Sequence, residues 1–177
     1  RFVGRYNADL ANDLGNLLQR TVGMAMKYQN GLLGGPGEGD VTGLSAAAQE
    51  EARTYCDAMD IYELQTGLKA IWSLVRAGNL AVDTHAPWEL AKHPDKAGEL
   101  DAVLSQLAAL LHQIAILAYP FMPERSTAMA KALGQDQDPG MWRLDNLHDP
   151  SLAPRQVQET EPLFPRLDPE EVIGSDA

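Results

Sequence analysis

Asn16 and Arg20 are two polar residues whose types and spacing could recognise a ligand together. They are four residues apart, so on an α-helix their side chains lie one turn above the other on the same face. An amide and a guanidinium in that arrangement can both reach one flat ligand, and a single nucleobase is such a ligand. The same pair can also be merely solvated on the polar face of an amphipathic helix, and the spacing alone does not decide between these interpretations.

The block Ala86-Pro87-Trp88 carries a second candidate for base recognition. Pro87 suits the first turn of a short helix, because its ring fixes φ and its missing N–H would have been unpaired there. A tryptophan that begins such a helix after a loop can be half covered, and an exposed indole offers a stacking platform worth about 1–3 kcal/mol per base. Trp88 can alternatively be a core residue, which is the prediction for Trp72 in its regular apolar stripe.

The other reactive side chains do not form a catalytic or metal-binding pattern. Asp57, Asp60 and Glu63 recur at helical spacing, which is typical of a solvated acidic face. Cys56 is the single cysteine, which excludes an internal disulfide, and it has no evident base partner. The histidines show no metal-ligand spacing, and no Gly-x-Ser-x-Gly or Walker motif is present. We therefore expect no catalytic residue, no metal and no cofactor in this chain.

Length and composition predict one soluble globular domain from a reducing cytoplasm. The chain has 177 residues, 45% of them hydrophobic, which is enough apolar material for one packed core. We find no stretch of about eighteen uncharged apolar residues and expect no membrane span. Because the chain opens on Arg1, without an initiator methionine or a signal-peptide pattern, we expect it to be a piece of a longer protein.

The net charge of −11 argues against nucleic-acid binding, because phosphate neutralisation usually needs a basic surface. The distribution of the charge weakens that objection. Residues 1–36 carry four basic and two acidic side chains, and residues 67–96 carry four basic and three acidic ones. Residues 37–66 carry one basic and seven acidic side chains, and residues 134–177 carry three basic and ten acidic ones. The acidic excess lies away from both candidate motifs, and we expect weak RNA affinity for the isolated domain.

Apolar periodicity predicts an all-α protein, an antiparallel bundle of about five helices. The first helix runs from about Tyr6 to Gln29. With Leu14 at zero and about 100° per residue, Asn16 lies at about 200° and Arg20 at about 240°, so both face away from the apolar stripe. A second helix is expected at 42–59, capped by Thr42 or Ser45, and a third at 62–78, ending near Gly78-Asn79. These two helices can be separate or continuous. Further helices are expected at 88–92, 100–118 and 123–133.

The pattern changes after residue 134, because six of the eleven prolines fall in residues 135–177 and regular periodicity is lost. We therefore divide the chain into a helical domain (1–134), an irregular Pro-rich C-terminal strap (135–168) and an acidic tail (169–177) that is expected to be disordered. The strap is expected to pack back on the bundle, or on a domain outside this chain, through the apolar anchors Met141-Trp142 and Pro162-Leu163-Phe164-Pro165.

Several blocks occur in one order along the chain: Arg5-Tyr6-Asn7-Ala8-Asp9-Leu10-Ala11-Asn12-Asp13-Leu14-Gly15-Asn16-Leu17, Arg20, Asn79, Ala86-Pro87-Trp88-Glu89-Leu90-Ala91-Lys92, Pro120-Phe121-Met122-Pro123 and Pro162-Leu163-Phe164-Pro165-Arg166. In this order and spacing, they resemble the C-terminal anticodon-binding domain of methionyl-tRNA synthetase, a class I aminoacyl-tRNA synthetase. The resemblance runs from Arg1 to about Asp168. The Pro-Trp and Leu-Phe-Pro-Arg blocks favour the methionine enzyme over related synthetases with this type of bundle.

The resemblance implies that Asn16, Arg20 and Trp88 contact the anticodon CAU. The candidate supporting residues are Asn12, Asn79 and Pro87. Cytosine presents acceptors at O2 and N3 and a donor at N4, so Arg20 can donate to the acceptors while Asn16 matches the remaining edge. A uracil would leave buried polar groups unpaired, at a cost on the order of 1–3 kcal/mol.

The same resemblance implies a parent protein that is a cytoplasmic, ATP-dependent methionine-tRNA ligase of protein biosynthesis. The family's His-Ile-Gly-His-like and Lys-Met-Ser-Lys-Ser-like motifs are absent from these residues, so this chain alone is expected to be inactive. The parent is expected to use ATP with Mg, with Zn as a further candidate. The expected partners are the initiator and elongator methionine tRNAs and the parent's own catalytic domain, with no DNA and no membrane.

Two alternatives remain open. The same fold can serve another class I synthetase, which would change the base that is read. A helical protein-interaction module without an RNA role would instead show an exposed apolar patch on the first helix or the strap, and its binding would be insensitive to salt. One departure also matters: the family commonly has a tyrosine at the position of Ala81, so a packing or RNA contact near Trp88 can be lost here.

Overall fold

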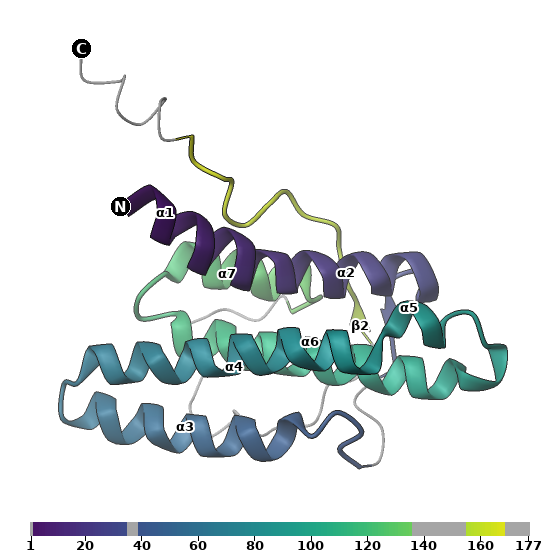
Figure 1. Ribbon diagram of the computed structural model, residues 1–177, viewed down its shortest axis with the longest axis horizontal. Coiled ribbons are helices and arrows are strands. Elements are labelled where there is room, and N and C mark those ends of the chain that lie inside the picture. Colours follow the sequence, from purple (N-terminus) through teal and green to yellow (C-terminus); the bar gives the residue numbers. More distant parts are fainter. Residues whose placement is uncertain (1, 35–38, 136–154, 169–177) are drawn as a thin grey trace.

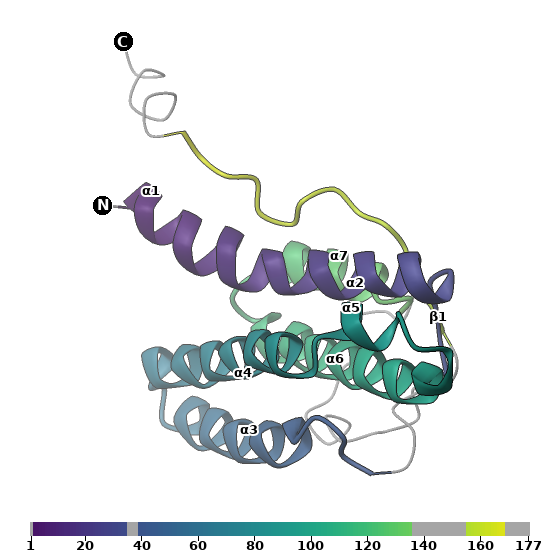
Figure 2. The same cartoon turned by 45° about the vertical axis from the view of Figure 1, so that its right-hand side comes forward.

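The computed structural model describes residues 2–34, 39–135 and 155–168, and these residues are mostly helical (Figure 1). The helices lie side by side in a bundle, and two short strands pair at one end of it. In the view turned by 45°, the C-terminal segment runs along the outside of the first helix (Figure 2). The predicted all-α bundle is confirmed.

The first helix is continuous but changes its winding. It consists of α1 (Phe2–Arg5), the π-helical segment η1 (Tyr6–Gly15) and α2 (Asn16–Gln29). A π-helical turn holds more residues than an α-helical turn, so the step of about 100° per residue fails in η1 and holds only in α2. Asn30 ends the helix in a left-handed conformation, with φ of 52°. The predicted helix at 6–29 is confirmed, with an earlier start.

The next two helices, α3 (Leu44–Asp60) and α4 (Leu64–His85), form an antiparallel hairpin. The predicted end of the third helix near Gly78-Asn79 is wrong, because α4 continues to His85. Gly78 is buried where α4 meets the first helix, and a Cβ there would lie 2.7 Å from Cδ2 of Leu17 and 2.9 Å from Cδ2 of Leu110. A side chain at this position would have to displace the terminal methyl groups of both leucines, so the glycine belongs to a packed contact inside α4 and does not end the helix.

A carboxylate caps the start of α3, where Thr42 or Ser45 was expected. Asp40 accepts hydrogen bonds from the backbone N–H groups of Leu44 at 3.1 Å and Ser45 at 2.8 Å. Thr42 contributes only a longer contact of 3.4 Å from its Oγ1 to the backbone nitrogen of Leu44. Partial burial opposes ionisation of Asp40, but hydrogen bonds from Ser45, Thr42 and Leu44 outweigh it and lower the pKa of this carboxyl group.

The bundle is completed by α5 (Pro87–Leu90), the 3₁₀ turn η2 (Pro94–Lys96), α6 (Ala97–Ala118) and α7 (Pro123–Ala132). The stretch Pro94–Ala118 has a mean hydropathy of 1.6 in its most apolar part, so by length and composition alone it could cross a membrane. However, 78% of that part is buried inside the bundle. It is accordingly the central core helix of this domain.

Residues 155–168, which we call the strap segment, are the described part of the predicted strap. The segment begins with β2 (Arg155–Gln156), which pairs antiparallel with β1 (Leu32–Leu33) beside the first helix. Three of its apolar side chains, Val157, Leu163 and Phe164, are buried in the same core as the helices. The anchor Met141-Trp142 and the acidic tail at 169–177 lie outside the described residues.

Two ionisable side chains, the half-buried His112 on α6 and the buried Arg155 on β2, lie near each other. Burial, and to a smaller extent the positive charge of Arg155, lowers the pKa of His112 to about 4. Burial also lowers the pKa of Arg155 to about 10, which leaves its guanidinium charged at neutral pH. In the folded protein at neutral pH, His112 is therefore neutral.

We expect the free energy of unfolding to decrease as the pH falls from about 6.5 to about 4. In this window His112 binds a proton in the unfolded chain, where its pKa is ordinary, but not in the folded one, so acid favours unfolding. The loss should be on the order of 2–3 kcal/mol. Urea unfolding at several pH values should give a flatter dependence for His112→Gln, and the same dependence in both proteins would contradict this assignment.

The packing at Gly78 can be tested against a matched glycine. Gly78→Ala should lower the free energy of unfolding by about 1–3 kcal/mol, because the new methyl group would overlap Leu17 and Leu110. Gly23 in α2 has nothing within 4 Å of its would-be Cβ, so Gly23→Ala should raise it by about 0.5–1 kcal/mol through helix propensity. Urea unfolding measures both, and changes of the same sign at the two positions would disprove the close contact.

Candidate nucleic-acid interface

Arg20, Asp83 and Trp88 form a surface cluster where the first helix meets α4 and α5. Nη2 of Arg20 donates a hydrogen bond to Oδ1 of Asp83 at 2.7 Å. Cζ of the same guanidinium lies 5.8 Å from the centroid of the Trp88 ring, within the range of a cation–π contact. The guanidinium is thus held between a carboxylate and an aromatic ring, and we call these three residues the Arg20 cluster.

The packing of α2 and α4 brings the Arg20 cluster together. The two helices run in the same direction, since Asn79 contacts the backbone of Asp13 and, further along both helices, Asp83 contacts Arg20. Beyond His85 the chain turns through Ala86, which has a left-handed φ of 41°.

Pro87 and Trp88 follow this turn as the first two residues of α5. Pro87 is buried, whereas Trp88 is 36% exposed. The indole is therefore partly covered, as its place after a loop predicted, and keeps a surface on which a base could stack.

Asn16 lies at the start of α2, one turn before Arg20, and its side chain is exposed. Its carboxamide makes no hydrogen bond within the part of the chain that the structure describes. Asn16 and Arg20 therefore share one face of the helix, as their spacing predicted, but only Arg20 belongs to the cluster with Trp88. The amide of Asn16 is available to a ligand that covers this face.

The three candidate supporting residues have structural contacts. Nδ2 of Asn79 donates to the backbone oxygen of Asp13 at 3.2 Å, which ties α4 to the first helix. Pro87 is buried at the start of α5. Asn12 is exposed, and its Oδ1 accepts a hydrogen bond of 2.7 Å from Nη2 of Arg166. Their participation in RNA binding stays a prediction.

Sequence reasoning did not identify Asp83, which orients Arg20. The third helix was expected to end near Gly78-Asn79, whereas α4 carries Asp83 one turn past Asn79 on the same face. This spacing of four residues was the signal that an uninterrupted helix would have revealed. Ala81 lies in the same helix, is 5% exposed and faces the core. The loss of a packing or RNA contact near Trp88 at this position stays a prediction.

The other residues weighed for chemistry lie elsewhere. Trp72 is partly buried, packs against the core and donates from Nε1 to the backbone oxygen of Asp9 at 3.3 Å, so it belongs to the margin of the core and not to its interior. Burial, followed by the negative charges of Asp60 and Asp57, raises the pKa of the Cys56 thiol, which is the opposite of activation. Among the described residues, no group of three or more His, Cys, Asp or Glu side chains could hold a metal ion.

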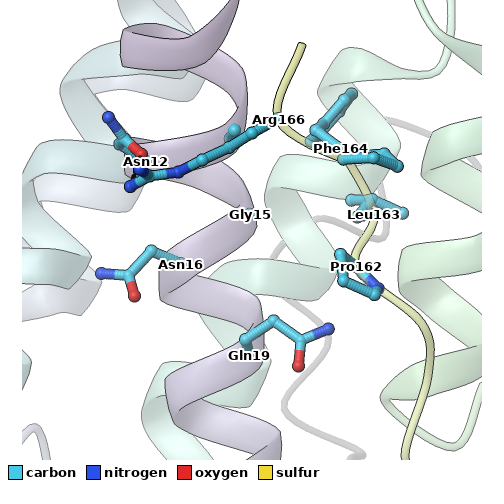
Figure 3. A pocket seen from close by; sticks show the side chains of 10 residues that line it. Asn12, Gly15, Asn16, Gln19, Pro162, Leu163, Phe164 and Arg166 are labelled. Carbon is cyan, nitrogen blue, oxygen red and sulfur yellow. Dashed lines mark hydrogen bonds between the residues drawn. The ribbon is translucent and has the colours of Figure 1, made fainter. Parts of the chain in front are cut away.

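A groove of about 610 Å³ lies beside Asn16, between the first helix and the strap segment (Figure 3). One wall is formed by the helix and the other by the stretch from Pro162 to Arg166. The complete set of lining residues is Ala11, Asn12, Gly15, Asn16, Gln19, Pro162, Leu163, Phe164, Pro165 and Arg166. The candidate interface thus has two parts, the Arg20 cluster on one side of Asn16 and this groove on the other.

Comparison with known proteins places this helical bundle in the class of anticodon-binding domains. A protein-family model described as the anticodon-binding domain of methionyl tRNA ligase matches residues 34–172. The chain belongs to this family, which confirms the resemblance seen in its sequence blocks.

Curated relatives agree with this assignment. The chain is 41% identical over 178 residues to a methionine–tRNA ligase of Bacillus subtilis and 40% identical over 177 residues to one of Lactococcus lactis. In both cases the match covers 98% of this chain but only 26% of the relative. The chain therefore spans about a quarter of the length of these proteins.

Solved structures with this fold come from the same group of enzymes. The apo form of Mycobacterium tuberculosis methionyl-tRNA synthetase matches with a TM-score of 0.84 at 28% identity, over 94% of this chain and 34% of that one. The same enzyme bound by methionyl-adenylate gives a TM-score of 0.83 at 27% identity, over 92% of this chain and 33% of that one.

Proposed function

We propose that this domain recognises the anticodon CAU of the initiator and elongator methionine tRNAs. It would thereby position them for aminoacylation by a catalytic domain outside this chain. The observation that carries the proposal is the Arg20 cluster, in which a guanidinium with hydrogen-bonding capacity lies 5.8 Å from a partly exposed tryptophan. Membership of the anticodon-binding family supports RNA as the ligand.

Affinity and specificity come from different side chains in this proposal. Trp88 stacks on a base and tolerates any base, because every base has an aromatic face. Arg20 donates to the O2 and N3 acceptors of cytosine, and the carboxamide of Asn16 matches the remaining edge. Asp83 holds Arg20 in place before RNA arrives, and the pair is exposed enough to exchange partners, with side-chain exposures of 29% for Arg20 and 64% for Asp83.

Ligase chemistry belongs, in this proposal, to the part of the parent protein that this chain does not include. The relatives are named methionine–tRNA ligases, and the chain spans about a quarter of them. ATP with Mg, and Zn as a further candidate, would act in that part, in the cytoplasm.

The protein-interaction alternative is less well supported. Its signature was an exposed apolar patch on the first helix or the strap. Large exposed hydrophobic side chains do not occur at residues 3–29 or in the strap segment.

Two substitutions in the Arg20 cluster should weaken binding to a CAU anticodon hairpin by roughly tenfold or more each. Arg20→Ala removes the base donors and Trp88→Ala removes a stacking contact worth about 1–3 kcal/mol. Arg53→Ala is the matched control, since Arg53 also pairs with a carboxylate, Glu50 at 3.8 Å, but lies on α3. Fluorescence anisotropy measures the affinity and circular dichroism the helicity. Unchanged binding by both variants would remove these residues from the site.

The identity of the base that is read can be tested with three hairpins. A CAU hairpin should bind more tightly than GAU or CAA hairpins of the same stem, because a mismatched base leaves polar groups unpaired, at about 1–3 kcal/mol. Binding should also weaken steeply as salt rises. Equal affinities for the three hairpins would assign the fold to another synthetase, and an absence of salt-sensitive binding would favour the interaction module.

A further inference from the structure

The groove beside Asn16 has fixed walls. Gln19 donates from Nε2 to the backbone oxygens of Thr160 at 3.2 Å and Glu161 at 3.4 Å. Beyond the groove, Asn7 exchanges two hydrogen bonds of 2.9 Å with the backbone of Leu167. Between these two points, Leu163 and Phe164 are buried in the core. The strap segment is therefore held to the first helix on both sides of the groove.

Gly15 lies where the two walls of the groove meet. A Cβ at Gly15 would lie 3.7 Å from Cδ2 of Phe164 and 3.1 Å from the backbone oxygen of Leu10. The lining combines Gly15 and two buried apolar residues, Leu163 and Phe164, with polar residues such as Asn16 and Gln19 (Figure 3). A flat ligand with a polar edge fits this combination.

The charge of the groove is unusual for this chain. The protein has a net charge of −11, yet among the described residues that line the groove none is acidic and Arg166 is the one that is charged. Asn12, Asn16 and Gln19 add carboxamides to the same surface. Arg166 uses Nη2 to bind Oδ1 of Asn12, which fixes the guanidinium and leaves its other N–H groups exposed at the rim. Such a site is complementary to an anionic ligand.

The groove is continuous with the surface proposed to read the anticodon. Asn16 lines the groove and lies one helical turn from Arg20. A ligand bound at Arg20 and Trp88 that extends across the first helix must therefore pass Asn16 and enter the groove. A single-stranded RNA loop is such a ligand, because each base is followed by a phosphate and another base.

We propose that the groove binds the nucleotide adjacent to the base read by Arg20 and Trp88, and that Arg166 donates hydrogen bonds to its phosphate. The inference rests on the proposed function and extends it to a second nucleotide subsite. Asn12 is a positioning residue here, since its Oδ1 accepts a hydrogen bond from the guanidinium of Arg166 and both residues line the groove.

The test uses the 177-residue chain and a CAU anticodon hairpin. Arg166→Gln should weaken binding about five- to twentyfold and reduce the slope of log affinity against log salt by about 0.7, the value for one phosphate contact on a single strand. Hairpins that carry one uncharged methylphosphonate at successive loop linkages then locate the contact. One linkage next to the recognised base should weaken binding to the wild type, with little further loss in Arg166→Gln.

Arg125→Gln is the matched control. Arg125 lies on α7 with its Cζ 6.0 Å from the ring centroid of Phe164, so it contacts the same strap segment, but it does not line the groove. It should leave hairpin affinity within about twofold of the wild type, a difference of less than about 0.5 kcal/mol. An equal loss for both variants would overturn the subsite, because the effect would then be general electrostatic attraction.

Other outcomes separate this inference from the proposed function. Wild-type affinity in Arg166→Gln would overturn the subsite while leaving the Arg20 cluster intact. The same holds if the loss from Arg166→Gln simply adds to the loss from the methylphosphonate at every linkage. The groove would then be open to a protein segment. A wild-type chain that fails to bind the hairpin would overturn both proposals together.

Discussion

The close contact between α2 and α4 at Gly78 is the constraint on which the rest of this surface depends. Cδ2 of Leu17 lies only 2.7 Å from the place that a Cβ at position 78 would take. Because the two helices run in the same direction at this short separation, the end of α4 lies beside Arg20. The guanidinium of Arg20 can therefore contact both Asp83 and Trp88. A wider separation would leave the guanidinium in solvent, with the same residues present and no cluster between them.

The energetics of the Arg20 cluster suit a surface that must exchange one set of contacts for another. Ion pairs as exposed as Arg20–Asp83 contribute only about 0–1 kcal/mol, so the carboxylate directs the guanidinium without binding it strongly. A base that offers two acceptors can replace that carboxylate at small cost. In the proposed binding mode, Arg20 would leave Asp83 for a base, and the uncompensated negative charge of Asp83 would then oppose phosphates that approach in the wrong place.

Local periodicity was sufficient to predict most helices and the outward face of Asn16 and Arg20. It failed where two distant segments touch. A glycine followed by an asparagine is typical of a helix end, and the residues around Gly78 do not show that Leu17 packs on it. The predicted helix therefore stopped too early, which left Asp83 in a loop. The partial exposure of Trp88 was predicted because it depends on a local feature, a proline-initiated helix after a turn.

The groove lay beyond sequence reasoning for the same physical reason, since the Asn12–Arg166 hydrogen bond joins residues 154 positions apart. Its formation requires the strap segment to be in place, and that segment is held by Leu163 and Phe164 in the common core. A ligand that touches both walls binds only the closed arrangement, so it must also stabilise that arrangement. Occupation of the groove and docking of the strap segment on the first helix are therefore coupled. The surface proposed to face RNA would thus be completed by long-range packing of the C-terminal part of the domain, although Asn16 and Arg20 lie near the start of the chain.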